Sequence, residues 1–284
     1  MIQLHVATVN TCNAACHFCI YSKPENDYPR GVMDMGLYRK IIDEAKTIPQ
    51  IDSVAFSSLG EPLLDRFLVE RIRYAREARP DWTPIEVYTN GVSLTPAKFE
   101  ALKAAGVNSV TISLNAATAA QHEEIMGLKG KFGTVTANAR YAADHADGVD
   151  VLVKAVRDDE HFRLSDQVQF LNTWGYRLRP DLGGGVGQVV MQANWAGGVK
   201  FIDARHKYFD PNERCQRALE QISVLWDGVV SLCCFDPLAK HKLGDLKTQT
   251  IREVYNSDEY VKFREMHAEN RAAEHPMCRV CTRV

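Results

Sequence analysis

The stretch TCNAACHFCIYSKPE, residues 11–25, places three cysteines, Cys12, Cys16 and Cys19, in the spacing C-x3-C-x2-C. Three thiols are an odd number for disulfide pairing and one fewer than the four ligands of a closed structural zinc site. A cube of four iron atoms held by only three thiolates leaves one iron open to a small chelating molecule. The spacing therefore favours an iron–sulfur site with an open iron. Zinc, with His17 as a fourth ligand, remains an alternative.

The composition is that of an ordinary globular protein. The chain has 284 residues, of which 45% are hydrophobic and 25% charged, and its formal net charge is −2. This near-neutral balance gives no general attraction to nucleic acid or to an anionic membrane, so neither is expected as a partner. The N-terminus is typical of a strand and not of a signal peptide, and we expect a cytoplasmic protein. Thiols stay reduced in that compartment, so clustered cysteines indicate metal binding or catalysis.

Strand and helix patterns alternate through the first part of the chain. The expected strands are 2–9, 54–58, 85–91, 109–116, 149–156 and a short one near 176–180. The expected helices are 37–48, 67–78, 95–106, 132–145 and 164–174. Six such units predict the α/β class, with a parallel sheet and outer helices in a partial (β/α)6, TIM-like barrel. The glycine-rich segment 181–201 predicts a loop that passes a ligand or leads into a second domain.

Polar and small residues follow most of the predicted strands. The reactive groups of such sheets gather at the carboxyl ends of the strands, so we expect these residues on one rim of the barrel. After the cysteine loop, they are Gly60, Glu61 and Pro62, then Asn90 and Gly91, then Ser113 and Asn115, and finally Lys154 and Arg157.

Five further cysteines lie in the last quarter of the chain: Cys215, Cys233, Cys234, Cys278 and Cys281. Their distance from the first three indicates two metal centres. The segment ISVLWDGVVSLCC predicts a hairpin that turns at Asp227-Gly228, and a helix is expected around 250–267. A zinc ribbon is one alternative for four of these thiols. We expect one domain over residues 1–200 and a second, smaller one over residues 201–284.

These motifs together resemble the radical S-adenosylmethionine (SAM) superfamily. C-x3-C-x2-C with Phe18 before its last cysteine is the family's cluster motif, and LGEPLL (59–64) resembles its Gly-Gly-Glu motif, with Leu59 replacing the first glycine. YTNG (88–91) and ISLNAAT (112–118) resemble two further SAM-contacting segments, with Asn115 where aspartate is common. The resemblance implies a SAM-binding [4Fe–4S] cluster on Cys12, Cys16 and Cys19. It implies SAM contacts at Phe18, Gly60, Glu61, Pro62, Thr89, Asn90, Ser113, Asn115 and Lys154. For Lys154, simple exposure to solvent remains an alternative.

The C-terminal cysteines resemble the twitch or SPASM extension of the same superfamily, which LGDL (243–246) and HPMCRVC (275–281) also fit. The resemblance implies one auxiliary [4Fe–4S] cluster, fully ligated by Cys215, Cys233, Cys278 and Cys281. Cys234 is then left over as a small buried side chain, a replacement ligand, or a hydrogen-atom donor to a substrate radical. Three roles are open for the neighbouring Asp236: a base, a hydrogen-bond partner of the cluster loop, or a residue that forms a turn.

The resemblance implies an enzyme that cleaves SAM reductively to a 5′-deoxyadenosyl radical, which takes hydrogen from a substrate. A reductant such as flavodoxin or ferredoxin is implied as a partner. A closed auxiliary cluster is suited to electron relay, which favours net oxidation of a small sugar or cyclitol. The cysteine spacing is similar to that of a cyclitol-oxidising radical SAM dehydrogenase. That enzyme has an arginine where this chain has Leu182, although Arg179 lies nearby in the sequence.

Several alternatives to oxidation stay open. One is redox-neutral epimerisation of a sugar or peptide residue, with Cys234 as the hydrogen donor. Another is a peptide- or protein-modifying maturase. The chain starts about ten residues before its first cluster motif, which favours a small substrate because it leaves no room for the usual peptide-recognition domain. The last alternative is an electron-transfer or zinc-binding module without turnover.

Overall fold

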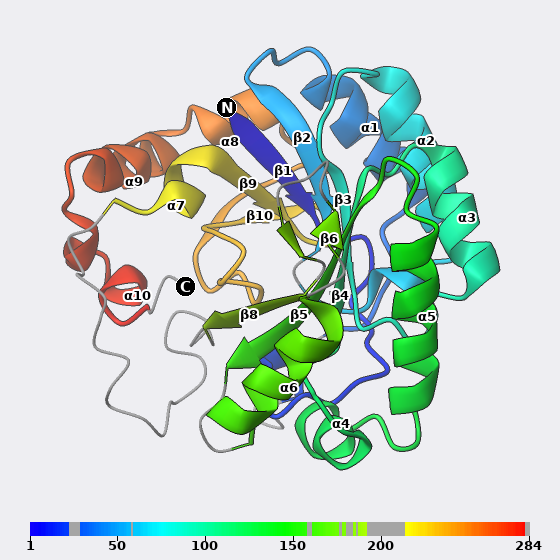
Figure 1. Cartoon of the computed structure of the whole chain (residues 1–284). Helices are drawn as coiled ribbons and strands as arrows, with labels where there is room; N and C mark the ends of the chain where they lie inside the picture. The colour runs from blue at the N-terminus through cyan, green and yellow to red at the C-terminus, as the bar shows by residue number, and fades with distance from the viewer. Residues whose placement is uncertain are drawn as a thin grey trace.

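The computed structural model describes residues 1–22, 29–57, 59–157, 161–175, 178–179, 184–185, 187–191 and 214–281. In this part of the chain one large sheet has the strand order β11-β10-β9-β1-β2-β3-β4-β5-β8 (Figure 1). The six parallel strands of the barrel are β1 (Ile2–Val6), β2 (Ile51–Phe56), β3 (Ile85–Thr89), β4 (Ser109–Ser113), β5 (Asp150–Arg157) and β8 (Gly187–Met191).

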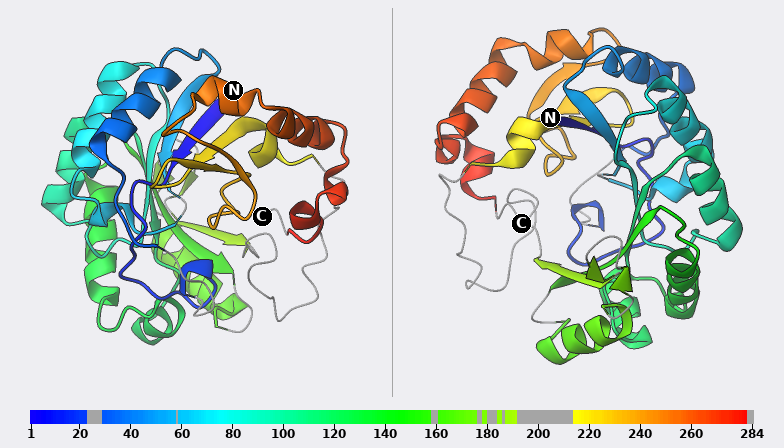
Figure 2. Two further views of the ribbon diagram at one scale, coloured as in Figure 1. Left: turned by 180° about the vertical axis from the view of Figure 1, so that it is seen from behind. Right: turned by 45° about the horizontal axis from the view of Figure 1, so that its top comes forward.

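Helices cover the convex face of this curved sheet (Figure 2). They are α1 (Met35–Ala45), α2 (Leu68–Ala78), α3 (Pro96–Ala105), α5 (Phe132–Asp144) and α6 (Leu164–Trp174). Strand side chains such as Leu4, Val54, Val87 and Ile112 are fully buried beneath them in one apolar core. The alternating residues of each strand face the concave side, because successive side chains of a strand point to opposite faces. The predicted partial (β/α)6 barrel is confirmed.

Two predicted elements are wrong. The sixth parallel strand is β8, Gly187–Met191, inside the stretch expected to be a loop. Leu178–Arg179 (β6) instead pairs antiparallel with Gly184–Gly185 (β7) in a separate two-stranded sheet. The expected helix around 250–267 is two helices, α8 (Ile251–Tyr255) and α9 (Asp258–Ala268), because Ser257 caps a new helix by accepting a hydrogen bond from the Tyr260 N–H.

Helix α4 (Ala119–Met126) was not predicted. Thr118 is its N-cap and Gly127, at a φ of 65°, its C-cap. Three short 3₁₀ helices complete the described barrel and tail: η1 (Ile20–Ser22), η2 (Pro62–Leu64) and η5 (Ala272–Glu274).

The C-terminal segment extends the barrel sheet. Its strands are β9 (Gln221–Val224), β10 (Val229–Ser231) and β11 (Lys242–Asp245), and its remaining helices are α7 (Gln216–Glu220) and α10 (Pro276–Arg279). The predicted hairpin at Asp227-Gly228 is confirmed as β9–β10. Strand β9 also pairs parallel with β1, so both parts of the chain share one continuous sheet. The expected domain boundary at residues 200–201 lies outside the described residues.

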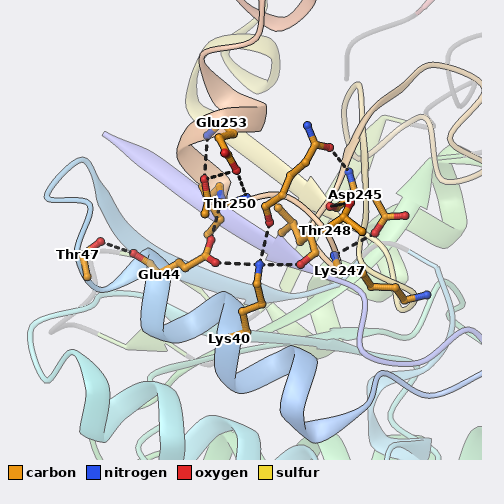
Figure 3. A network of polar contacts seen from close by, with 11 residues as sticks. Lys40, Glu44, Thr47, Asp245, Lys247, Thr248, Thr250 and Glu253 are labelled. Carbon is orange, nitrogen blue, oxygen red and sulfur yellow. Dashed lines mark hydrogen bonds and ion pairs between the residues drawn. The ribbon is translucent and has the colours of Figure 1, made fainter.

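A polar network fixes the C-terminal segment to α1 (Figure 3). The Lys40 ammonium donates to the carbonyl oxygens of Leu246 and Gln249, both at 2.8 Å, and forms an ion pair with Glu44 at 2.8 Å. The other Glu44 oxygen accepts from the Ile251 N–H at 2.8 Å, at the start of α8. The Glu44 bond satisfies a backbone N–H that the start of α8 leaves without a partner, and together these bonds hold α8 in one position on the barrel.

A buried ion pair joins Asp65 to Arg71 on α2. The two side chains are 0% exposed and lie 2.8 Å apart, from Arg71 Nε to Asp65 Oδ2. The guanidinium also donates to the Met33 carbonyl, and the Asp65 Oδ1 atom accepts from the Phe67 N–H at 2.9 Å. This set of bonds connects the segment before α1 with α2.

Replacing Asp65 with alanine is expected to lower the free energy of unfolding by about 3–5 kcal/mol, because it leaves a buried guanidinium charge without its partner. Anaerobic urea denaturation measures the loss. Glu70→Ala is the matched control, since Glu70 forms an exposed pair with Arg39 at 3.1 Å and its removal should cost about 0–1 kcal/mol. Equal losses in the two variants would contradict the expectation.

None of the helices that the structure describes is both long enough and apolar enough to cross a membrane.

Candidate active site at the two ends of the barrel

The first three cysteines lie together in the loop that follows β1. Cys12, Cys16 and Cys19 are all half-buried, and none of them forms a disulfide. The pKa of Cys16 is well above its ordinary value, first because the thiol is buried and then because negative charge on Cys19 and Cys12 repels its own. Burial is also the main cause of the raised pKa of Cys12. The structure therefore brings the three predicted ligands within electrostatic reach of one another in one loop.

Helix α4 holds this loop in place. The backbone N–H groups of Ala15 and His17 donate to the carbonyl oxygens of Met126 and Ile125, at 2.9 and 3.1 Å. The Cys16 thiol lies 3.3 Å from the sulfur of Met126. The sequence pattern did not reveal this role, although Thr118 and Gly127 are the usual residues at a helix start and end.

Gly60 and Glu61 lie directly beneath the cysteine loop. The Glu61 N–H donates to the Thr11 carbonyl at 2.8 Å. Gly60 has a φ of +84°, and a Cβ atom there would lie 2.4 Å from the Val9 carbonyl oxygen. A glycine is therefore required at this close approach of two backbone segments.

Gly60→Ala is expected to displace the cysteine loop and to lower both iron content and SAM affinity, because its Cβ atom would overlap the backbone before Cys12. Iron analysis and equilibrium dialysis with labelled SAM measure the two losses. Gly133→Ala is the control, since a Cβ atom at Gly133 meets nothing within 4 Å. Full iron content and SAM affinity in Gly60→Ala would refute the expectation.

The Glu61 carboxylate is committed to protein donors. It is 2% exposed and accepts from the Thr89 hydroxyl at 2.6 Å, the Asn90 N–H at 2.6 Å and the Leu63 N–H at 3.0 Å. Burial raises its pKa and these three donors lower it. Glu61 thus joins the ends of β2 and β3, so that the predicted SAM-contacting residues after the two strands form one unit.

Two asparagines connect further strand ends to this unit. The Asn90 amide donates to the Asn13 side chain at 2.7 Å, within the cysteine loop. Asn115 has a φ of 55°; its amide oxygen accepts from the Val156 N–H at 3.0 Å and its nitrogen lies 3.0 Å from the Met126 sulfur. Both polar atoms of Asn115 therefore bind protein groups. Ser113, in register with Lys154, lies half-buried at the same rim.

The second group of cysteines lines one pocket. Cys215, Cys233, Cys278 and Cys281 surround it together with apolar side chains such as Phe263 and Met277. Burial raises the pKa of Cys233 well above its ordinary value, and the neighbouring charges of Cys234, Cys281 and Cys278 raise it further. The Cys278 sulfur lies 3.5 Å from Nε2 of His267, which is fully buried. His267 was not among the predicted site residues.

Cys234 lies beside this pocket as a protonated thiol at neutral pH. Burial raises its pKa to about 11, although the positive charge of Arg217 opposes the shift. A thiolate at this position would raise the pKa of Tyr88 on β3, and this electrostatic coupling places Cys234 near the barrel interior. Asp236 accepts the backbone N–H groups of Lys240 and His241, both at 2.9 Å. Of its three predicted roles, the structure supports the turn former.

The two cysteine groups lie at opposite ends of the barrel. Cys12, Cys16 and Cys19 follow the carboxyl end of β1. Cys215 precedes α7 and β9, and β9 runs parallel to β1, so Cys215 lies at the amino ends of the strands. Cys233 follows β10, which runs antiparallel to β9 and therefore ends at the same side. The barrel interior separates the two groups.

Polar side chains line this interior. Strand register places Gln3, His5, Ser53, Glu86, Tyr88, Ser109, Thr111, Lys154 and Ser223 on the concave face. Most of them were not predicted as site residues. The alternation of polar and apolar residues in IQLHV, IEVYT and SVTIS indicates them, since a strand with one apolar and one polar face has period two.

Three oxygens of this face lack partners. Among the described residues, the side-chain oxygens of Thr111, Gln221 and Ser223 are buried without a hydrogen bond. Buried polar groups are nearly always paired, so such atoms mark places where a ligand or water is accommodated.

Lys154 points toward the middle of this interior. Its ammonium lies 5.5 Å from the centre of the Tyr88 ring. Burial lowers its pKa, and the negative charges of Glu86 and Asp150 oppose this. Leu182 lies outside the described residues, and of Arg179 only the backbone in β6 is described.

The side chains of the two cysteine groups are of the type that iron–sulfur clusters need. Thiolates are the usual ligands of such clusters, three cysteines leave an iron open, and four close it. In the described part of the chain, no group of three His, Cys, Asp or Glu side chains is arranged around a single metal ion.

Comparisons with known proteins agree with this arrangement. The model of the "Radical SAM superfamily" matches residues 6–155, just over half of the chain, and that of the "Iron-sulfur cluster-binding domain" (SPASM) matches residues 215–282. The S-adenosyl-L-methionine-dependent 2-deoxy-scyllo-inosamine dehydrogenase of Niallia circulans is 24% identical over 99% of this chain and 93% of its own length. The PqqA peptide cyclase of Gluconobacter oxydans is 27% identical over 77% of this chain and 57% of its own.

Solved structures share the fold. The structure of BtrN in complex with AdoMet and 2-DOIA has a TM-score of 0.67 and 20% identity, and covers 99% of this chain and 93% of that one. The structure of anSMEcpe with bound AdoMet and the Kp18Cys peptide has a TM-score of 0.69 and 15% identity, and covers 94% and 83%.

These matches exclude the alternative of a module without turnover. The chain belongs to the radical SAM superfamily, and it is an enzyme whose cofactors are SAM and two [4Fe–4S] clusters.

Proposed function

We propose that this enzyme oxidises a small hydroxylated substrate, such as a cyclitol or a sugar, at a CH–OH group. The relative from Niallia circulans, which matches nearly the whole chain, is named as a dehydrogenase of 2-deoxy-scyllo-inosamine. The observation that carries the proposal is the placement of two cysteine groups at opposite ends of an interior lined by polar side chains. An oxidation needs a hydrogen acceptor and an electron acceptor, and this arrangement offers the substrate one at each end.

The proposal assigns the cofactors as follows. Cys12, Cys16 and Cys19 hold the SAM-binding cluster, and Cys215, Cys233, Cys278 and Cys281 hold the auxiliary cluster. When bound, SAM and the two clusters supply the acceptor for a hydrogen atom and the acceptor for an electron. Residues 1–200 form the SAM-binding part and residues 201–284 the auxiliary part. The proposed SAM contacts are Phe18, Gly60, Glu61, Pro62, Thr89, Asn90, Ser113 and Asn115.

The protein groups in this scheme mainly position the cofactor and the substrate. Glu61 fixes Leu63, Thr89 and Asn90 through its three hydrogen bonds, so its effect on SAM acts largely through these neighbours. Asn115 fixes the ends of β4 and β5 in the same way. Lys154 faces Tyr88, and we propose that its ammonium binds the substrate and not the SAM carboxylate. The unpartnered oxygens of Thr111, Gln221 and Ser223 are suited to hydroxyl groups of a small polar substrate.

Anaerobic reconstitution with iron, sulfide, SAM and a reductant tests the proposal, with flavodoxin or ferredoxin as the proposed physiological reductant. The probes are 2-deoxy-scyllo-inosamine and myo-inositol, and the products are followed as 5′-deoxyadenosine and as a new carbonyl group. We expect one SAM to be consumed for each carbonyl formed. Modification of a peptide without any oxidation of these probes would overturn the proposal in favour of a maturase.

Epimerisation is the second candidate, and the position of Cys234 favours it. Its thiol is protonated at neutral pH and lies near Tyr88 in the barrel interior, as a hydrogen-atom donor should. In deuterated water an epimerase would place one deuterium on the product carbon, and Cys234→Ala would abolish this. Full turnover of Cys234→Ala to a carbonyl product, without deuterium in the carbon skeleton, would exclude epimerisation by this thiol.

A further inference from the structure

We propose that Glu86 accepts the proton that the substrate hydroxyl loses during oxidation, a role that rests on the proposed function. Conversion of CH–OH to C=O removes one hydrogen atom from carbon, one proton from oxygen and one electron. The cofactors account for the hydrogen atom and the electron. The proton remains, and a protein group within hydrogen-bond reach of the hydroxyl can take it.

Glu86 has the position that such a group needs. It lies on β3 in register with Ala55 of β2 and Ser109 of β4, so its side chain shares the concave face with both. It is 8% exposed. The Ser109 hydroxyl lies 3.3 Å from the Glu86 Oε1 atom, and the Tyr88 hydroxyl is hydrogen-bonded to the same carboxylate. Since a carboxylate accepts about four hydrogen bonds, two donors leave capacity for a substrate hydroxyl.

Tyr88 connects Glu86 to the auxiliary end of the barrel. The Tyr88 hydroxyl lies within electrostatic reach of Cys234 and Arg217, and Arg217 lines the pocket of the auxiliary cysteines. A substrate next to Glu86 and Tyr88 would therefore lie between the two cysteine groups. Loss of the proton at this place leaves negative charge on the substrate oxygen, which the nearby cations Lys154 and Arg217 stabilise.

The surroundings of Glu86 make its carboxylate a stronger base than an exposed one. Burial raises its pKa, and the negative charge of Asp150 on β5 acts in the same direction. Lys154, Tyr88 and Ser109 oppose the rise and keep the ionised form accessible. A general base works best when its pKa lies near the operating pH.

The other buried acid–base groups of the described barrel are less suited. Both ring nitrogens of His5 are engaged, by Ser57 at 2.8 Å and by Gln3 at 2.6 Å. Burial and the charge of Arg217 lower its pKa to about 4, so it is a weak base. The carboxylates of Glu61 and Asp236 accept backbone N–H groups and thereby hold loops together.

Glu86→Gln tests the proposal in the reconstituted holoenzyme, with 2-deoxy-scyllo-inosamine and myo-inositol as probes. We expect kcat for carbonyl formation to fall about 100-fold or more, the usual range for loss of a general base. Formation of 5′-deoxyadenosine should persist and exceed the carbonyl product, because hydrogen is still removed but the proton is not. Iron content, the electron paramagnetic resonance spectrum of the reduced clusters and the Kd for SAM should match the wild type. Glu86→Asp should restore part of the rate.

The pH profile provides a second readout. The wild-type rate should decrease as the pH drops below the pKa of Glu86. The residual rate of Glu86→Gln should not show this decrease. Glu70→Gln, on the exposed surface of α2, is the matched control and should behave as the wild type. If the wild type forms the carbonyl and Glu86→Gln does so at the same rate with the same profile, the assignment of Glu86 is overturned while the proposed function stands. If the wild type oxidises neither probe, the proposed function fails and the role of Glu86 with it.

Discussion

Replacing Cys16 with alanine is expected to abolish SAM cleavage and to lower the iron content from about eight to about four atoms per chain. Cys16 is the middle cysteine of the loop that α4 holds through Met126, and its thiol is surrounded by those of Cys12 and Cys19. Two cysteines cannot hold a cube of four irons against loss to solvent. Because the proposed function places the other four iron atoms at the opposite end of the barrel, they should be unaffected.

Iron and sulfide analysis, absorption near the iron–sulfur band and chromatography of 5′-deoxyadenosine measure these losses. The fold itself should survive, since the Cys16 side chain is only partly buried and packs against the apolar core without being a member of it. A circular dichroism spectrum equal to that of the wild type is therefore the control. Undiminished SAM cleavage by Cys16→Ala would contradict the assignment of the three-cysteine cluster.

Cys281→Ala is expected to give the complementary result: SAM cleavage continues, and the carbonyl product is lost. Cys281 is buried at the auxiliary pocket, where its N–H donates to the Cys278 carbonyl at 3.2 Å. Removing one of four thiolates opens or dissociates the auxiliary cluster, so the electron from the substrate has no acceptor. We expect at least a tenfold fall in the ratio of carbonyl product to 5′-deoxyadenosine, on the order of 1.4 kcal/mol in the competing steps.

The same two assays measure both variants, and each variant is the control for the other, because each should retain the cluster that the other loses. An unchanged ratio in Cys281→Ala, together with loss of its iron, would show that oxidation does not pass through the auxiliary cluster. That outcome would favour the redox-neutral reaction.

Much of the fold was predictable because local sequence patterns indicate its strands and helices. The (β/α) units follow from hydrophobic periodicity, and α3 follows from Thr95 at its N-cap and Gly106 at its end. The two cysteine groups follow from spacing alone. The rim positions follow from the rule that side chains after parallel strands share one end of the sheet.

The elements that escaped prediction depend on distant contacts. Helix α4 has only eight residues, and its place is set by the hydrogen bonds that Met126 and Ile125 accept from the cysteine loop. Strand β8 begins at Gly187, where the pattern indicated a loop, and it is defined by pairing with β5. Glu86 and His5 were missed because their strands were used only to predict the fold. A polar residue at every second position of a strand nevertheless indicates a sheet face that contacts water or a ligand.

The pairing of β9 with β1 has a consequence for synthesis of the chain. Gln3 of β1 pairs with Gln221 of β9, so β1 leaves the ribosome about two hundred residues before β9 does. At roughly 5–20 residues per second, the interval is on the order of 10 to 40 seconds. During that time the backbone groups on one side of β1 form an open edge, which another chain could pair with. Nascent chains halted before β9 should therefore be the most prone to aggregate.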